Sequence, residues 1–242
     1  MVTKELPGQQ MGGRRDRIYA IGDVHGHASR LRAMHDAIRR DLRDNPAGTV
    51  TLVHLGDYID RGPDSAACLA LLAASDPIEG VPTVNLMGNH ERMMLDALEW
   101  PGQGRLWLEN GGDAALRSWG IDPRTQPERW RAGIPADHLH FLETLVLTHL
   151  AGDFLFVHAG VQPGIRLDKQ SPLDLLWIRA GFLDWDGIML PEAPQLVIVH
   201  GHTPASEPEV RRNRIGIDTN AARGGKLTCA ALSADSVYFL QV

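Results

Sequence analysis

Five times along this chain of 242 residues, an apolar run ends in a turn that combines glycine with histidine, aspartate or asparagine. These turns read GDVHG (22–26), GDYIDRG (56–62), GNHE (88–91), HAG (158–160) and HGHTP (200–204). Alternating strand and helix patterns over residues 17–100 predict parallel strands joined by helices. Ligands of such sheets bind beyond the carboxyl ends of the strands, so we expect all five turns to converge on one site.

The flanking segments indicate an α/β fold. Apolar spacing predicts a helix over residues 28–43, and a β-branched run predicts a strand over 49–55. Further short strands are expected at 214–218, 227–231 and 237–241. Because the later strands lack long helices between them, we expect them to form a second, mixed sheet.

Composition excludes several classes of protein. Lys and Arg number 24 against 30 Asp and Glu, so the net charge of −6 argues against a nucleic-acid binder with a basic surface. Two cysteines give no disulfide framework, and no apolar run reaches the roughly 18 residues that span a membrane. We therefore expect a reduced, cytoplasmic protein that binds neither nucleic acid nor membrane.

The chain is predicted to hold a flexible tail over 1–16 and one domain over 17–242. Within that domain, residues 100–150 break the strand pattern, and we expect a helical insertion there. This segment holds four of the six tryptophans. It is either a packing subdomain or a lid that faces the substrate, and the sequence leaves both open.

The turns contain side chains of the types that commonly bind metal ions in proteins. They are Asp23, His25, Asp57, Asn89, His90, His158, His200 and His202. Carboxylate, imidazole and amide oxygen together suit Mn, Fe or Zn. One carboxylate can bridge two cations about 3.5–4 Å apart, so a dinuclear site is possible on chemical grounds.

The five motifs, in this order, resemble the phosphoprotein phosphatase family of the calcineurin-like metallophosphoesterases. The bacterial and lambda-phage-type serine/threonine phosphatases are the most similar branch, and the resemblance covers roughly residues 17–240. It implies an α/β fold with two mixed sheets sandwiched between helices and an active site at the strand carboxyl ends. One departure is Asn220, where relatives are expected to have glycine.

The resemblance also implies a set of metal ligands for two divalent ions, Mn first, with Fe and Zn as alternatives. They are Asp23 and His25 for the first ion, Asp57 for both, and Asn89, His158 and His202 for the second. In this pattern the histidine of GHTP is the ligand, which leaves His200 a supporting role at most. A bridging hydroxide would attack phosphorus in line.

Further roles follow from the same resemblance. His90 matches the general acid, and an ordinary pKa of about 6.5 would suit that task. Asp60 would orient His90, the alternative being a turn-capping aspartate. Arg61, Arg179 and Asn89 would bind the phosphate, since a guanidinium offers a forked pair of donors. The alternative for Arg179 is an ordinary surface arginine.

The predicted function is a metal-dependent phosphomonoesterase, foremost a protein phosphatase for phosphoserine, phosphothreonine and also phosphotyrosine. The alternative is symmetrical hydrolysis of diadenosine tetraphosphate. A phosphodiesterase or nuclease and a catalytically inert phosphate-binding module rank lower, because GDYIDRG matches throughout and no ligand or acid is missing. The expected partner is a phosphorylated protein or peptide, or a small phosphoester.

Overall fold

The computed structural model describes residues 4–5, 16–74, 76–234 and 236–242. Most of the predicted tail, residues 1–16, lies outside them. The strands of the described part form two sheets. The first runs in the order β1 (Lys4–Glu5), β11 (Ser236–Gln241), β10 (Thr228–Leu232), β2 (Arg17–Ile21), β3 (Val50–His54) and β4 (Thr83–Asn85). The second runs β5 (Thr148–Ala151), β6 (Phe154–Val157), β7 (Val197–His200), β9 (Arg214–Gly216) and β8 (Glu209–Val210).

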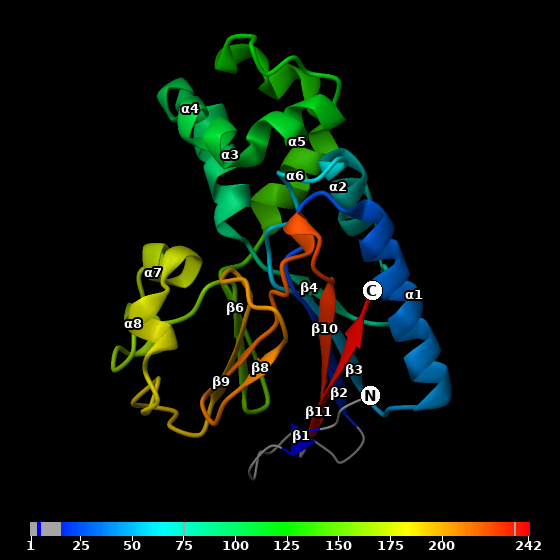
Figure 1. Ribbon diagram of the computed structural model, residues 1–242, viewed down its shortest axis with the longest axis vertical. Helices are drawn as coiled ribbons and strands as arrows, with labels where there is room; N and C mark the ends of the chain where they lie inside the picture. The colour runs from blue at the N-terminus through cyan, green and yellow to red at the C-terminus, as the bar shows by residue number, and fades with distance from the viewer. Residues whose placement is uncertain (1–3, 6–15, 75, 235) are drawn as a thin grey trace.

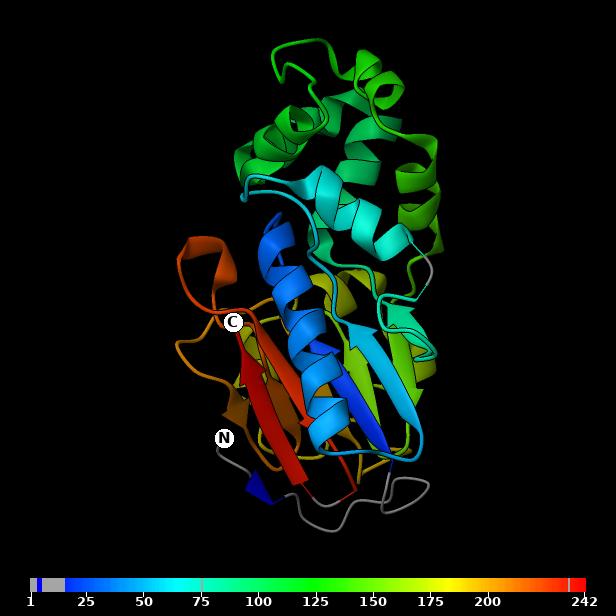
Figure 2. The ribbon, with the colours of Figure 1, turned by 90° about the vertical axis from the view of Figure 1, so that its right-hand side faces the viewer.

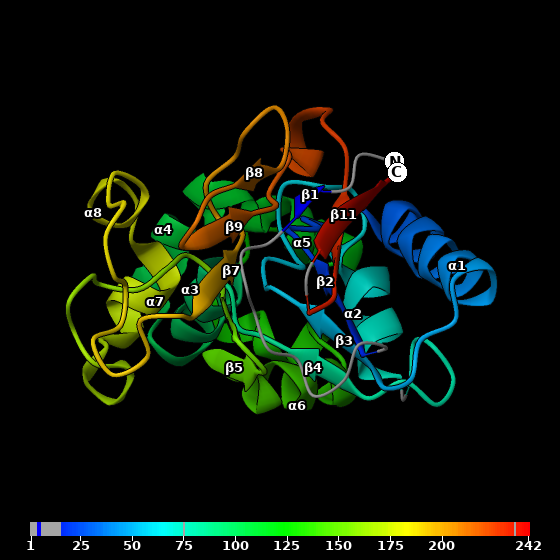
Figure 3. The ribbon, with the colours of Figure 1, turned by 90° about the horizontal axis from the view of Figure 1, so that it is seen from below.

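Helices flank both sheets and fill the upper part of the molecule (Figure 1). They are α1 (Ala28–Asp44), α2 (Ser65–Ala73), α3 (Asn89–Glu99), α4 (Gly104–Trp107), α5 (Asp113–Ser118), α6 (Ala136–Thr144), α7 (Pro172–Trp177) and α8 (Ala180–Leu183). Seen from below, the sheets lie between α1 and α2 on one side and α7 and α8 on the other (Figure 3). The predicted α/β class with two mixed sheets between helices is confirmed.

The side chains of each central strand divide between two cores because they alternate across the sheet. In β2, Ile18 and Ala20 pack between the sheets, whereas Tyr19 and Ile21 face α1 and α2. In β6, the phenylalanines at both alternate positions join the core between the sheets, and Leu155 faces α7 and α8. Both faces of these strands are buried, which explains their continuous apolar sequences.

Strands β2, β3 and β4 are parallel, as the helix–strand alternation predicts. The last two strands differ from the expectation of a separate second sheet. β10 pairs antiparallel with β2 and β11 joins β10, so both extend the first sheet. The continuous apolar sequence of a strand that is buried on both faces does not predict which strand it pairs with. The sequence therefore could not predict this pairing.

Residues 101–144 form short helices and turns above the carboxyl ends of the strands (Figures 1 and 2). Trp107 and Trp130 are buried there with their rings in edge contact, whereas Trp100 is half exposed. None of the helices in the described part of the chain combines the length and apolarity that crossing a membrane requires.

Candidate active site

The loops after β2 and β3 are joined by backbone hydrogen bonds. The N–H groups of Val24 and His25 both donate to the carbonyl of Asp57, at 3.0 and 2.8 Å. His25, Asp57 and Asp60 have φ angles of 45°, 54° and 72°, a left-handed conformation that costs free energy in residues other than glycine. Such strain persists only where the surroundings enforce it, and here it turns the side chains toward one centre.

Glycines let the backbone come close to the acidic side chains. A Cβ on Gly88 would lie 2.2 Å from Oδ1 of Asp57, and one on Gly201 would lie 2.1 Å from Oδ1 of Asp23. Any other residue at these two positions would displace the carboxylates.

Glu91 holds the Asp57 loop in place. Its buried carboxylate accepts hydrogen bonds from the backbone N–H groups of Asp57, Tyr58 and Gly88, at 2.8, 2.7 and 2.9 Å. Burial raises the pKa of Glu91, and these N–H groups counter that shift. Sequence reasoning gave Glu91 no structural role; its position three residues after Gly88, where a capping glutamate reaches back, is the signal that was available.

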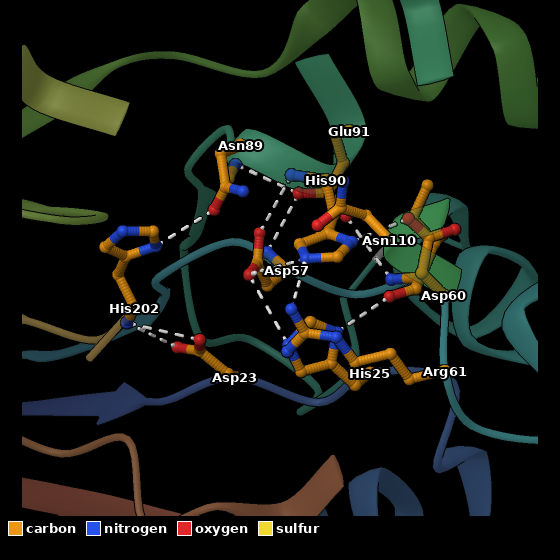
Figure 4. Close-up of polar contacts among 12 residues, drawn as sticks. Asp23, His25, Asp57, Asp60, Arg61, Asn89, His90, Glu91, Asn110 and His202 are labelled. Carbon is orange, nitrogen blue, oxygen red and sulfur yellow. Dashed lines mark hydrogen bonds and ion pairs between the residues drawn. The ribbon is translucent and has the colours of Figure 1, made fainter. Parts of the chain in front are cut away.

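Asp57 lies at the centre of two groups of ligand atoms (Figure 4). The first combines it with His25 and His90, and the second with His158 and His202. Oδ2 of Asp57 is 3.5 Å from Nε2 of His25, and Oδ1 is 3.4 Å from Nε2 of His158. Asp57 is thus the one residue that these two groups share.

Asn89 brings an amide oxygen into the second group. Its Oδ1 is 2.9 Å from Nε2 of His158 and 3.0 Å from Nδ1 of His202. Nδ1 of His158 lies 2.8 Å from the carbonyl of Leu55, to which it donates, and burial lowers the pKa of this imidazole to about 3. The ring is therefore neutral, and Nε2 presents a lone pair to the lone pairs of Asn89 and Asp57.

These residues fit divalent cations. Lone pairs that face one another at such distances repel, and a cation among them would turn repulsion into coordination. His25 is arranged in the same way: Nδ1 donates to the carbonyl of Ile59 at 3.0 Å, which leaves Nε2 directed at Asp57. A backbone carbonyl that fixes the tautomer and orientation of an imidazole is the usual support of a metal-binding histidine.

Asp23 approaches the centre from the β2 side. Both of its oxygens lie 3.1 Å from the backbone nitrogen of His202 (Figure 4). Burial, with the negative charges of Asp218 and Asp57, raises the pKa of Asp23 well above its usual value. Sequence reasoning missed Asp218, which follows β9 and lies beside Asp23. Buried carboxylates this close together repel one another unless one takes up a proton or a cation lies between them.

His90 and Asp60 form a buried pair beside the first group. Nδ1 of His90 is 2.6 Å from Oδ2 of Asp60, and the indole N–H of Trp107 donates to both Asp60 oxygens, at 3.0 and 2.9 Å. Burial, with the charges of His25 and Arg61, lowers the pKa of His90 well below 6.5. The expectation of an ordinary pKa is therefore wrong for these surroundings, because it ignored the loss of solvent.

The two predicted arginines contact different residues around the centre. Arg61 donates from Nη1 to Nε2 of His25 and from Nη2 to Nε2 of His90, at 2.8 and 2.9 Å. Arg179 is exposed and donates to the Thr203 hydroxyl at 3.3 Å. Its charge acts on His158 and His202, which places it near the second group.

Three further histidines, in or beside the motifs, lie outside the two ligand groups. His200 turns away and packs edge-on against Phe182, with ring centroids 4.9 Å apart. His54 bonds to His35 on the α1 side of the sheet, and His27 precedes the first turn of α1. Among the described residues, neither ligand group includes any of these histidines.

Comparisons with known proteins identify the family. The family model described as calcineurin-like phosphoesterase matches residues 16–236. Serine/threonine-protein phosphatase 1 of Salmonella typhimurium is 32% identical, with 89% of this chain and 91% of that protein covered. The symmetrical bis(5'-nucleosyl)-tetraphosphatase of Chromohalobacter salexigens is 26% identical, with coverages of 88% and 94%.

A solved structure supports the fold. The cold-active protein-tyrosine phosphatase of a psychrophilic Shewanella species superimposes with a TM-score of 0.58 over 98% of this chain and 83% of that one, at 18% identity. At this identity the likeness concerns the fold alone. With the family match and the 32% identical relative, it leads to one conclusion: the chain belongs to the calcineurin-like phosphoesterase family.

Proposed function

We propose that this protein is a metal-dependent protein phosphatase that hydrolyses phosphoserine and phosphothreonine, and also phosphotyrosine. The observation that carries the proposal is Asp57, which belongs to two ligand groups and lies next to the His90–Asp60 pair. The relatives named serine/threonine-protein phosphatase 1 and 2, 32% and 27% identical, support this choice of substrate.

We assign two divalent cations to the centre, Mn first, with Fe and Zn fitting the same donors. The ligands would be Asp23, His25, Asp57, Asn89, His158 and His202. Bound cations would lower the pKa of a coordinated water to near neutrality and offset the charge of the phosphoryl group. The protein's part is to hold Asp57 between both positions, which the Glu91 carboxylate and the backbone of Gly88 accomplish.

His90 would deliver a proton to the departing oxygen from Nε2. Asp60 at Nδ1 orients the ring, and Trp107 fixes Asp60. Arg61 and Arg179 would each bind a non-bridging oxygen of the phosphate, and the amide of Asn89 would contact the third non-bridging oxygen. A guanidinium charge in this position stabilises the charge that spreads over the phosphoryl oxygens in the transition state.

A second candidate is symmetrical hydrolysis of diadenosine tetraphosphate. It needs the same centre, and relatives with that name are 26% and 22% identical over most of this chain. The protein phosphatases rank higher because the 32% identical relative carries that name. We place the protein in the cytoplasm, since Cys68 and Cys229 are free and buried.

The first test uses purified protein loaded with Mn. We expect hydrolysis of p-nitrophenyl phosphate, and complete loss of it in excess EDTA with recovery on readdition of Mn, because the centre depends on cations. Kinetics with phosphoserine, phosphothreonine and phosphotyrosine peptides and with diadenosine tetraphosphate, measured side by side, then rank the substrates. Metal-loaded protein that hydrolyses the dinucleotide and none of the peptides would refute the protein phosphatase proposal.

A further inference from the structure

A cavity of about 280 Å³ opens next to Arg61, on the side away from His158 and His202. It is lined by Arg61, Glu109, Asn110, Gly111, Ala222 and Arg223. One wall is the turn Ala221–Arg223, and the other is the turn Leu108–Gly112 above the strands. Figure 4 shows Asn110 on the Arg61 side of the centre. The cavity therefore adjoins the place where the phosphate is proposed to bind.

The charge of this cavity is positive. Arg223 is exposed, and its guanidinium has no ion pair with any carboxylate of the described residues. Glu109 is the one acid in the lining, and its carboxylate already accepts from Nε of Arg105 at 2.7 Å. If Arg61 is engaged by the phosphate, Arg223 remains a free cation within the same cavity.

Both walls are fixed by hydrogen bonds. Arg30 of α1 donates to the carbonyls of Ala221 and Gly225, which anchors the turn that carries Arg223. On the opposite wall, the N–H of Arg61 donates to the carbonyl of Gly111 at 3.1 Å. A cavity whose walls are already ordered loses little conformational entropy when a ligand enters.

We propose that this cavity is a subsite for a second anionic group of the substrate, namely the carboxylate of an acidic residue that flanks the phosphorylated residue. The inference rests on the proposed protein phosphatase function and names its substrate class as acidic phosphopeptides. Arg223 would bind the carboxylate, since guanidinium and carboxylate form paired, charge-assisted hydrogen bonds. Asn110 would complete the contact.

The test compares phosphoserine peptides that carry aspartate or asparagine on either side of the phosphoserine. We expect wild-type protein to prefer the aspartate peptides by about two- to fivefold in kcat/KM, the range of a partly exposed ion pair. Arg223→Ala should abolish the preference, and Glu109→Gln should increase it because it removes from the lining a negative charge that repels the carboxylate of the peptide. Neither variant should change hydrolysis of p-nitrophenyl phosphate, which has no flanking residue.

Arg40→Ala is the matched control, because Arg40 is exposed on α1 at a distance from the cavity. It should retain the preference. Equal hydrolysis of the aspartate and asparagine peptides by wild-type protein, or an undiminished preference in Arg223→Ala, would overturn the subsite. If Arg223→Ala slows diadenosine tetraphosphate and not the acidic peptides, the second anion is a phosphoryl group and the carboxylate assignment is wrong.

The two proposals can fail separately. Should no peptide be hydrolysed, the dipeptides phosphoserine–glutamate and phosphoserine–glutamine are used as inhibitors of p-nitrophenyl phosphate hydrolysis. Stronger inhibition by the glutamate dipeptide, lost in Arg223→Ala, would support the subsite even though the protein phosphatase proposal had failed. Equal inhibition by the two dipeptides would refute the subsite.

Discussion

At the scale of single residues, His90 stands between two roles. Its Nε2 is 3.9 Å from Asp57 within a group of possible ligands, whereas its Nδ1 is tied to Asp60 at 2.6 Å. The contact with Asp60 is typical of a proton-donating histidine that a carboxylate orients. Trp107, on helix α4, donates a further hydrogen bond to Asp60.

We expect His90→Asn to lower kcat by about 10²–10⁴-fold, the usual contribution of acid–base catalysis, and to leave the metal content unchanged. Steady-state kinetics with p-nitrophenyl phosphate and metal analysis of the same sample give both quantities. A variant that loses a cation would instead place His90 among the ligands. His140→Asn, at an exposed position of α6, is the control for the loss of an imidazole.

The sequence indicated candidate residues that lie around the centre, but of the residues that support them it indicated only Asp60. Asp57, Asn89 and His202 stand in short motifs at strand ends, where spacing alone carries the information. Trp107 and Asp218 come from segments far in sequence from the residues they contact, and neither stands in one of the five turn motifs. Such contacts depend on how the helices and sheets pack, which no local pattern in the chain encodes.

At the scale of elements, the turn after β9 explains the one departure from the family pattern. Asn220 has φ 64° and ψ 38°, the left-handed conformation that glycine adopts freely and asparagine tolerates best among the other residues. Its N–H donates to Asp218 at 2.9 Å, and its carbonyl accepts from Gly225. Asparagine therefore preserves the turn that carries Arg223.

Substitutions at Asn220 test this reading. Asn220→Gly should leave the melting temperature almost unchanged, whereas Asn220→Val should cost about 1–2 kcal/mol because a β-branched side chain opposes positive φ. For a chain of this size that corresponds to about 2–8 °C in thermal unfolding. Equal melting temperatures for the two variants would contradict the left-handed conformation.

The elements themselves were largely predictable. The helix expected over 28–43 occupies Ala28–Asp44, and the strand expected over 49–55 occupies Val50–His54. Helix α2 begins at Ser65, where the Asp64 carboxylate accepts from the N–H of Ala67 and caps the first turn. Aspartate is among the residues preferred at this capping position.

At the scale of the whole molecule, burial of two histidines beneath the first sheet makes stability sensitive to acid. Nε2 of His35 on α1 lies 3.0 Å from Nε2 of His54 on β3, and Nδ1 of His54 bonds to Asn85. Burial lowers the pKa of His35 to about 4 and that of His54 to about 3. The charges of Asp36 and Arg39 also act on His35, in opposite directions.

Because both pKa values fall below the unfolded value of about 6.5, the unfolded chain binds more protons than the folded chain as the pH falls below about 6.5. These two histidines should therefore cost no stability above about pH 6.5 and should lower it increasingly as the pH falls toward 4. Denaturant unfolding of metal-free protein in EDTA should show a smaller decline for His35→Gln than for wild type. An identical pH dependence in wild type and His35→Gln would refute the burial of these histidines as a cause of the acid sensitivity. His140→Gln is the control and should behave like wild type.

The ligands of the candidate centre come from both halves of the sandwich. Asp57 and Asn89 follow strands of the first sheet, and His158 and His202 follow strands of the second. Cations held by both sets would bind the native chain and not the unfolded one, so their binding energy adds to the free energy of unfolding, by about 2.7 kcal/mol at a hundredfold excess over the dissociation constant. Bound cations would thus also hold the two sheets together, and chelation would weaken the association of the sheets as well as stop catalysis.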